Sequence, residues 1–137
     1  MIKIFLSTQT KRADVAKFLL ELHEILRSET FDAETDIKLI SKSKFNDPEH
    51  STPYTIIDLN YDISDLANVL MKLTVDDYSE TKIDKDDLNP PSLFVFGKII
   101  ESRLVYIKLK IKENKKRYVL CVSFHYAKDK MSFPYAK

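Results

Sequence analysis

The feature that most constrains the fold is a strict alternation of apolar and polar side chains from Val105 to Lys112, within a predicted strand from Leu104 to Lys112. Residues 105, 107, 109 and 111 are apolar, and the residues between them are tyrosine or lysine. Because successive side chains of a strand point to opposite faces of a sheet, this pattern predicts a strand with one apolar and one polar face. Leu93 to Ile100 and Arg117 to Tyr126 are rich in β-branched and aromatic residues. The sequence therefore predicts an antiparallel sheet near the end of the chain.

The connection between the last two predicted strands sets their expected pairing. A two-residue turn at Asn114-Lys115, or a four-residue loop from Glu113 to Lys116, gives the same register. That register places Tyr106 opposite Ser123, Lys108 opposite Cys121, Lys110 opposite Val119 and Leu104 opposite His125. The face directed away from the core then collects Tyr106, Lys108, Lys110, Ser123 and His125. The core side of the final strand receives Tyr118, Leu120, Val122, Phe124 and Tyr126.

The first half of the chain contains two segments with helical periodicity. From Thr10 or Lys11 to about Ser28, apolar residues recur at spacings of three and four, which predicts an amphipathic helix. A second helix is expected from Asp62 or Ser64, either of which can cap it, through Met71. A short helical turn can follow at residues 74–77.

Shorter segments of the first half favour strands and loops. Ile2 to Leu6 is predicted as a short strand, and Asp36 to Ile40 and Tyr54 to Leu59 as further strands, because they are brief and rich in Ile, Leu and Tyr. Residues 41–52 are polar and are expected to form a mobile loop. The paired prolines within residues 84–91 exclude a helix there. Together these patterns predict one α+β domain spanning residues 1–137, with N-terminal helices packed on a C-terminal antiparallel sheet.

The composition excludes several classes of function. The chain has one glycine, Gly97, whereas phosphate-binding loops and dinucleotide fingerprints need several at fixed spacing. Its single cysteine, Cys121, cannot support a disulfide framework and lies in an apolar run. No segment approaches the roughly 20 apolar residues that span a bilayer. We therefore expect a cytoplasmic protein with no membrane partner and no cofactor.

The charges are divided unevenly along the chain. Residues 28–97 carry a net charge of −9, whereas residues 98–137 carry +8. A basic segment of this density is typical of proteins that bind a polyanion such as RNA, although it is also compatible with an ordinary solvated surface.

The polar face of the predicted hairpin carries the groups that metal-free RNA cleavage needs. His125 is the natural base or acid, because the usual pKa of histidine, about 6.5, is the nearest to neutrality. Lys108, with Lys98 or Lys110, can hold the phosphate, and Tyr106 can donate to a phosphate oxygen or stack on an unpaired base. The predicted catalytic residues are Tyr106, His125, Lys108 and Lys98. The predicted substrate-binding residues are Lys110, Ser123, Tyr78 and Tyr126. No metal ligand is predicted.

Three segments in the second half of the chain resemble the MqsR family of bacterial toxins, which belongs with the RelE-like endoribonucleases. They are Leu73-Thr74-Val75-Asp76-Asp77-Tyr78, Val105-Tyr106-Ile107-Lys108-Leu109-Lys110-Ile111 and Val119-Leu120-Cys121-Val122-Ser123-Phe124. They match in order and spacing a Leu-x-x-x-Asp-Phe/Tyr element, a Val-Tyr-x-Lys strand and a final Val-Ser-Phe strand. The resemblance covers roughly the last half of the chain.

The resemblance implies a RelE-like fold and a toxin that cleaves mRNA without metal or ribosome and is neutralised by an antitoxin encoded beside it. The family's functional tyrosine corresponds to Tyr106. Its functional lysine does not carry over, because Tyr78 is followed by Ser79-Glu80-Thr81, and its glutamine has no counterpart that can be placed. His125 and Lys98 are expected to substitute for them. The expected partners are therefore mRNA and a cognate antitoxin protein.

Two other functions remain open at the level of sequence. The same basic hairpin suits a module that binds RNA, DNA or an acidic protein without catalysis. Metal-dependent hydrolysis through Asp76, Asp77, Glu80 and His125 is a third possibility, although these residues show no recognised ligand spacing.

Overall fold

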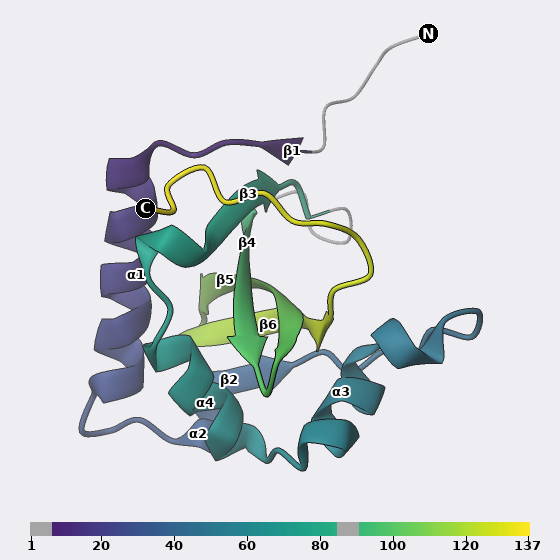
Figure 1. Cartoon of the computed structure of the whole chain (residues 1–137). Coiled ribbons are helices and arrows are strands. Elements are labelled where there is room, and N and C mark those ends of the chain that lie inside the picture. Colours follow the sequence, from purple (N-terminus) through teal and green to yellow (C-terminus); the bar gives the residue numbers. More distant parts are fainter. Residues whose placement is uncertain (1–6, 85–90) are drawn as a thin grey trace, which may run out of the picture.

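The protein is an α+β fold built on a six-stranded mixed sheet, seen in a computed structural model that describes residues 7–84 and 91–137 (Figure 1). The strand order is β1-β3-β4-β5-β6-β2, in which β2 runs parallel to β6 and the other neighbours are antiparallel. The strands are β1 (Ser7–Thr8), β2 (Ile37–Leu39), β3 (Tyr78–Lys82), β4 (Leu93–Ile100), β5 (Arg103–Glu113) and β6 (Arg117–Tyr126). The predicted strands at β2, β4, β5 and β6 are confirmed, whereas β1 and β3 were not predicted. The expected strand at Ile2 to Leu6 and most of the expected loop at residues 84–91 lie outside the described residues.

Four α-helices accompany the sheet in the described part of the chain: α1 (Arg12–Arg27), α2 (Ala33–Asp36), α3 (Thr52–Leu59) and α4 (Ile63–Met71). Short 3₁₀ turns occur at Pro48–His50 and Val75–Asp77. The prediction for α1 is confirmed, and its buried residues are Val15, Phe18, Leu19, Leu22, Ile25 and Leu26. The prediction for α4 is also confirmed, because Asp62 caps it and forms a reciprocal capping box with Asp65. None of the described helices is long and apolar enough to cross a membrane.

The helices and the apolar side chains of the central strands form the core. The ring of Phe18 in α1 stacks on Phe94 of β4, with 4.1 Å between ring centroids. Val105 and Ile107 of β5 are completely buried on the same side of the sheet. Figure 1 shows α1 along one side of the molecule with α4 near it, on the face of the sheet that carries these residues. The expected packing of helices on an apolar sheet face is therefore confirmed.

The prediction of a strand from Tyr54 to Leu59 is wrong, because this segment is the helix α3. Ser51 caps the helix by accepting a hydrogen bond from the Tyr54 N–H, and Pro53 occupies its first turn, where a missing N–H does no harm. Thr52, Thr55 and Asp58 recur every three residues and all face β6. The spacing of these polar residues is typical of a helix, whereas the prediction of a strand rested on the Ile, Leu and Tyr content alone.

The stripe on α3 extends the pairing of strand β6 beyond the end of β2. The Thr52 hydroxyl accepts a hydrogen bond from the Phe124 N–H at 3.1 Å, and Thr55 accepts one from the Tyr126 N–H at 3.0 Å. The Tyr126 hydroxyl in turn donates to Asp58. Side chains of a helix thus satisfy backbone donors at the edge of the sheet, which would otherwise be unpaired in a buried position.

The predicted register of the β5–β6 hairpin is wrong in two respects. Glu113 pairs with Arg117, so the connection has three residues, and a β-bulge at Val122 separates the pair Leu109–Cys121 from the pair Lys108–Ser123. The bulge reverses the alternation along β6. The buried core residues of β6 are therefore Val119 and Cys121 before it, and Phe124 and Tyr126 after it. Tyr118, Leu120 and Val122, which were expected in the core, are partly exposed.

The chain after β6 returns across the sheet on the face away from the helices. The Tyr135 hydroxyl donates to the Thr10 carbonyl at 2.6 Å, and the Tyr135 ring stacks on Tyr78. A Cβ atom at Gly97 would lie 2.7 Å from the Phe133 ring, so only glycine allows this close approach. In Figure 1 this yellow segment runs from β6 past β3 towards α1.

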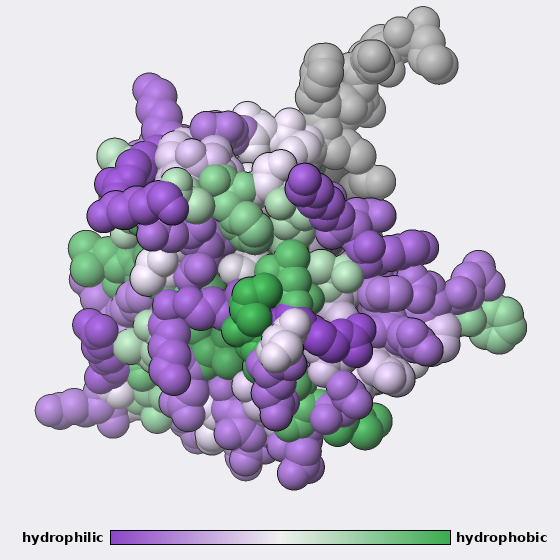
Figure 2. All heavy atoms as spheres, viewed as in Figure 1, coloured by the Kyte–Doolittle hydropathy of each residue, from purple (hydrophilic) through white to green (hydrophobic). Residues whose placement is uncertain are grey.

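The loop between β2 and α3 projects from the body of the molecule beside α3 (Figure 1). Its base is held by Asp47, which bonds to His50 Nδ1 at 2.7 Å and pairs with Lys128 of the C-terminal segment at 3.3 Å. In the same view, Figure 2 shows a hydrophobic group at the tip of this projection, surrounded by hydrophilic side chains. Phe45, which is 98% exposed, belongs to this loop.

Candidate functional site

The candidate site is a cavity of about 760 Å³ on the face of the sheet away from the helices. Its floor comes from β3, β5 and β6, and its walls come from the C-terminal segment, the β1 end and the 41–47 loop. This size is within the range of small-molecule pockets, so it has room for more than a single phosphate group. The charged and aromatic side chains that line it are Lys44, Glu80, Lys82, Tyr106, Lys108, His125, Lys128, Asp129 and Lys130.

Four of the predicted site residues meet in this cavity. Tyr106 pairs with His125 and Lys108 pairs with Ser123 on the adjacent strands β5 and β6. All four line the cavity, as the prediction of a common face requires, although the register that led to it was wrong. The observed pairing differs from the predicted one, but the bulge at Val122 reverses the alternation along β6. As a result, the side chains of residues 123 and 125 still lie on the face of Tyr106 and Lys108.

His125 is held in one orientation and one tautomer. Its ring stacks on Tyr106 at 5.0 Å between centroids, with 13° between the planes. Its Nδ1 lies 3.0 Å from the Tyr126 carbonyl oxygen. Because a carbonyl can only accept, Nδ1 of the neutral ring carries the hydrogen and Nε2 keeps its lone pair. The only hydrogen bond that the imidazole makes to described residues is this one, so Nε2 is available to a ligand.

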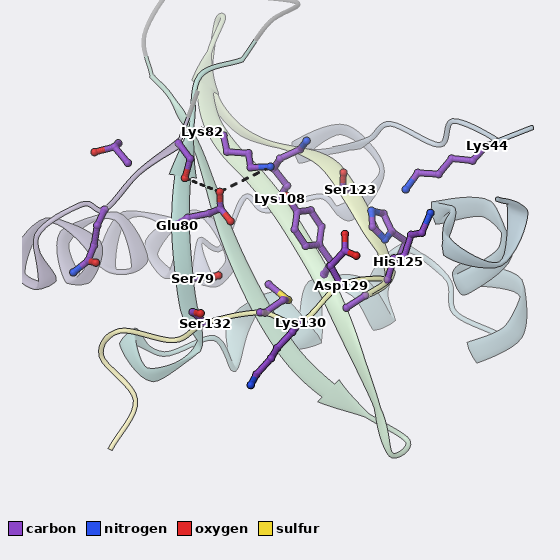
Figure 3. Close-up of a pocket in the computed structure, with 17 residues that line it drawn as sticks. Lys44, Ser79, Glu80, Lys82, Lys108, Ser123, His125, Asp129, Lys130 and Ser132 are labelled. Atoms are coloured by element: carbon purple, nitrogen blue, oxygen red, sulfur yellow. Dashed lines mark hydrogen bonds and ion pairs between the residues drawn. The ribbon is translucent and has the colours of Figure 1, made fainter. Parts of the chain in front are cut away.

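The surroundings of His125 favour its neutral form. Burial lowers the pKa of His125, and the positive charges of Lys44 and Lys108 lower it further, against the hydrogen bond to the Tyr126 carbonyl, which raises it. Figure 3 shows Lys44 pointing from its loop towards His125. At neutral pH the ring is therefore an unprotonated base within a cationic cavity.

The pKa values of Tyr106 and Lys108 are also shifted from their ordinary values. Burial, with a smaller contribution from the negative charge of Glu80, raises the pKa of Tyr106 to about 12. The phenol thus remains protonated near neutrality and can only donate its hydrogen to an anion. Burial and the charge of nearby Lys82 lower the pKa of Lys108, so its ammonium group gives up a proton more readily than an exposed lysine.

Five lysines surround the cavity, contributed by four parts of the chain: Lys44, Lys82, Lys108, Lys128 and Lys130. Two acidic residues, Glu80 and Asp129, oppose them. Glu80 accepts a hydrogen bond from the Ser7 hydroxyl at 2.8 Å and lies 3.9 Å from the Lys82 ammonium, as the dashed lines of Figure 3 show. The excess of positive charge creates a potential that attracts anions into the cavity.

Lys98 does not belong to the site. It pairs with Val105 on the helix-covered face of the sheet, opposite to the face of Tyr106. Its ammonium group bonds to Asp77 at 3.1 Å and to the Lys72 carbonyl at 3.4 Å. The sequence did not reveal this, because the face on which Lys98 lies depends on the pairing of β4 with β5.

The other three predicted residues are buried outside the cavity. Lys110 is completely buried and pairs with Asp84 at 3.0 Å, so it is not accessible to a substrate. Tyr78 is completely buried, and its hydroxyl accepts from the Thr10 N–H and bonds to Thr81. Tyr126 faces α3 on the core side. These residues support the framework around the site.

The sequence did not point to five charged residues of the cavity: Lys44, Lys82, Lys128, Asp129 and Lys130. Lys128 and Lys130 carried a weak signal, because they directly follow the last strand within a run of charges. Lys44 and Lys82 lie far from the hairpin in sequence. Only the approach of the 41–47 loop and of β3 brings them there.

The acidic residues considered for a metal are not brought together. Asp77 bonds to Lys98 on the helix-covered face, whereas Glu80 and His125 line the cavity. Within residues 7–84 and 91–137, no three His, Cys, Asp or Glu side chains form a cluster suited to a metal ion.

Comparison of the chain with models of known protein families finds no match. Comparison with curated proteins and with solved structures likewise finds none. The function must therefore be inferred from the chemistry of the cavity.

Proposed function

We propose that this protein is an endoribonuclease that cleaves mRNA without a metal ion and acts as the toxin of a type II toxin–antitoxin system. In this proposal the fold is a RelE-like variant of the MqsR kind, and the protein acts in the cytoplasm. The observation that carries the proposal is His125. It is a neutral imidazole whose Nε2 makes no hydrogen bond to the described residues, and it stacks on a protonated phenol in a cavity with an excess of lysines.

The chemistry assigns a role to each side chain. His125 Nε2 removes the proton from the 2′-hydroxyl of RNA, and the 2′-oxygen forms a bond to phosphorus as the bond from phosphorus to the 5′-oxygen breaks. Tyr106 donates a hydrogen bond to a phosphoryl oxygen, where negative charge develops. Lys108, whose pKa is lowered, transfers a proton to the departing 5′-oxygen. The products are a 2′,3′-cyclic phosphate and a 5′-hydroxyl.

The remaining charged groups bind and position the RNA. Lys82 lies beside Lys108, and Lys44, Lys128 and Lys130 stand on the loop and the C-terminal segment that form the walls. Lysines in this arrangement contact the phosphates that flank the reacting one. Ser123, which pairs with Lys108, hydrogen-bonds to the same phosphate or to the ribose in this proposal.

The test is incubation of the purified protein with a long mRNA in the presence of chelator. We expect discrete fragments that end in a 2′,3′-cyclic phosphate, and growth arrest when the protein is expressed in bacteria. RNA that stays intact both in chelator and in magnesium would disprove the nuclease. If the protein then still binds RNA, the cavity belongs to a non-catalytic binding module. Cleavage in magnesium alone would indicate metal-dependent hydrolysis instead.

A further inference from the structure

Phe45 is the most exposed large hydrophobic side chain of the described residues. It is 98% exposed and belongs to the loop between β2 and α3, which projects beyond the sheet (Figure 1). A phenylalanine left wholly in water gains nothing for the fold, since it makes no buried contact. A contact with a binding partner would account for its position.

The loop that carries Phe45 is also a wall of the cavity. Lys44, its neighbour in sequence, lines the cavity and points towards His125 (Figure 3). The loop is fixed at its base by the bonds of Asp47 to His50 and Lys128. Phe45 thus belongs to the loop that forms this wall and directly follows one of the lysines that line the cavity.

The surroundings of Phe45 fit a nucleobase better than an apolar protein surface. The neighbouring residues in the loop are lysine, serine, asparagine and aspartate, and the other exposed large hydrophobic side chains of the described chain lie on other segments. A hydrophobic hot spot of a protein interface normally has further apolar residues around it. A single aromatic ring among cations is instead typical of platforms for unpaired bases.

We propose that Phe45 is a nucleobase-stacking residue at the rim of the cavity, so that the ligand of this site is single-stranded RNA with an unpaired base held outside the reacting nucleotide. This inference rests on the proposed function and adds to it a preference for single strands. A base that is paired in a duplex cannot present its face to the ring, so duplex RNA should be a poor ligand.

The experiment measures binding apart from cleavage. A fluorescent 2′-O-methyl RNA oligonucleotide lacks the attacking hydroxyl and therefore cannot be cleaved. Phe45→Ala should weaken its binding by about 5- to 150-fold, the effect of losing one stacked base. Phe45→Trp should restore binding, whereas Phe45→Leu, which keeps an apolar side chain without a ring, should not. Ile57→Ala is the matched control, because Ile57 is 79% exposed on α3 and does not line the cavity.

A second arm identifies the contact itself. Oligonucleotides with one abasic site at successive positions should show one position at which the wild-type protein loses affinity and Phe45→Ala loses no more. The inference is overturned if Phe45→Ala binds the oligonucleotide as tightly as the wild type, which would leave Phe45 as a contact for a protein. It is also overturned if Ile57→Ala weakens binding equally.

The failures of the two proposals are distinguishable. If the wild-type protein neither binds nor cleaves RNA, the proposed function fails together with this inference. If it cleaves unmodified RNA but Phe45→Ala binds the modified RNA normally, only the stacking role fails. Thermal unfolding of Phe45→Ala should match the wild type, because the side chain is exposed.

Discussion

The two faces of the β5–β6 hairpin are built from alternate residues of the same strands, yet they differ in almost every property. Val105, Ile107 and Phe124 are completely buried against the helices. Tyr106, Lys108 and His125 face the cavity between them. Removing a side chain from the buried face should therefore lower stability, whereas removing one from the cavity face should lower the reactivity of the site. Substitutions of adjacent residues test this division directly.

The largest expected effect is on the cavity face. His125→Asn keeps a donor for the Tyr126 carbonyl but provides no base, so the rate of RNA cleavage should fall by about 10²- to 10⁴-fold. Single-turnover cleavage in chelator measures it. Lys115→Ala, an exposed change in the hairpin connection away from the cavity, is the control and should retain the wild-type rate. A variant His125→Asn that cleaves normally would remove histidine from the mechanism.

The next effect is on the helix-covered face. Phe124→Ala should lower the free energy of unfolding by about 3–5 kcal/mol, because it removes a completely buried ring and leaves a cavity. Tyr106→Phe, on the opposite face, removes a hydroxyl that bonds to no described residue and should change stability by less than about 0.5 kcal/mol. Denaturant unfolding compares the two. Equal losses of stability would contradict the division between the faces.

A smaller effect concerns the C-terminal segment that covers part of the cavity face. Gly97→Ala brings a Cβ to 2.7 Å from the Phe133 ring and should cost about 1–3 kcal/mol of stability through overpacking. In a protein that already carries Phe133→Ala, the substitution Gly97→Ala should cost less stability than it does in the wild type, because the clashing ring is absent. Unfolding of both single variants and the double variant measures this coupling. Simple additivity would show that the two residues do not meet in solution.

The smallest expected effect is the dependence of the rate on pH. Because the pKa of His125 is lowered, its base form persists below the usual histidine value of about 6.5. The rate should therefore stay constant down to about pH 6.5 and fall about tenfold per pH unit only below the lowered pKa. Lys108 as the acid predicts an alkaline limb below the usual lysine value of about 10.4. An acidic limb centred above pH 6.5 would contradict the neutral imidazole.

The lowered pKa of His125 also affects stability in a defined direction. The unfolded chain binds a proton at His125 more readily than the folded protein, so this residue opposes folding as the pH falls through about 6.5. His125→Asn should therefore reduce the loss of stability between pH 7 and pH 5. Unfolding midpoints at the two pH values measure it, with Lys115→Ala again as the control.

Sequence patterns were reliable where one element imposes its own periodicity. The apolar residues of α1 and the apolar residues 105, 107, 109 and 111 of β5 are buried as predicted, although Lys110 of β5 is buried as well. Sequence patterns failed where the composition of a segment favours one structure and its caps and tertiary contacts favour another. Thr55, Ile56 and Ile57 favour a strand by composition, but the cap at Ser51 and the contacts of α3 with β6 make this segment a helix.

The chain by itself determined the chemistry of the hairpin: a phenol, a lysine, a hydroxyl and an imidazole on two neighbouring strands. Only the tertiary structure decided which of them share a site. The bulge at Val122 brings Ser123 and His125 to the cavity face, while pairing with β4 sends Lys98 to the opposite face. The reason is that alternation is a local property of a strand, whereas register, bulges and the approach of distant loops depend on contacts between segments far apart in sequence.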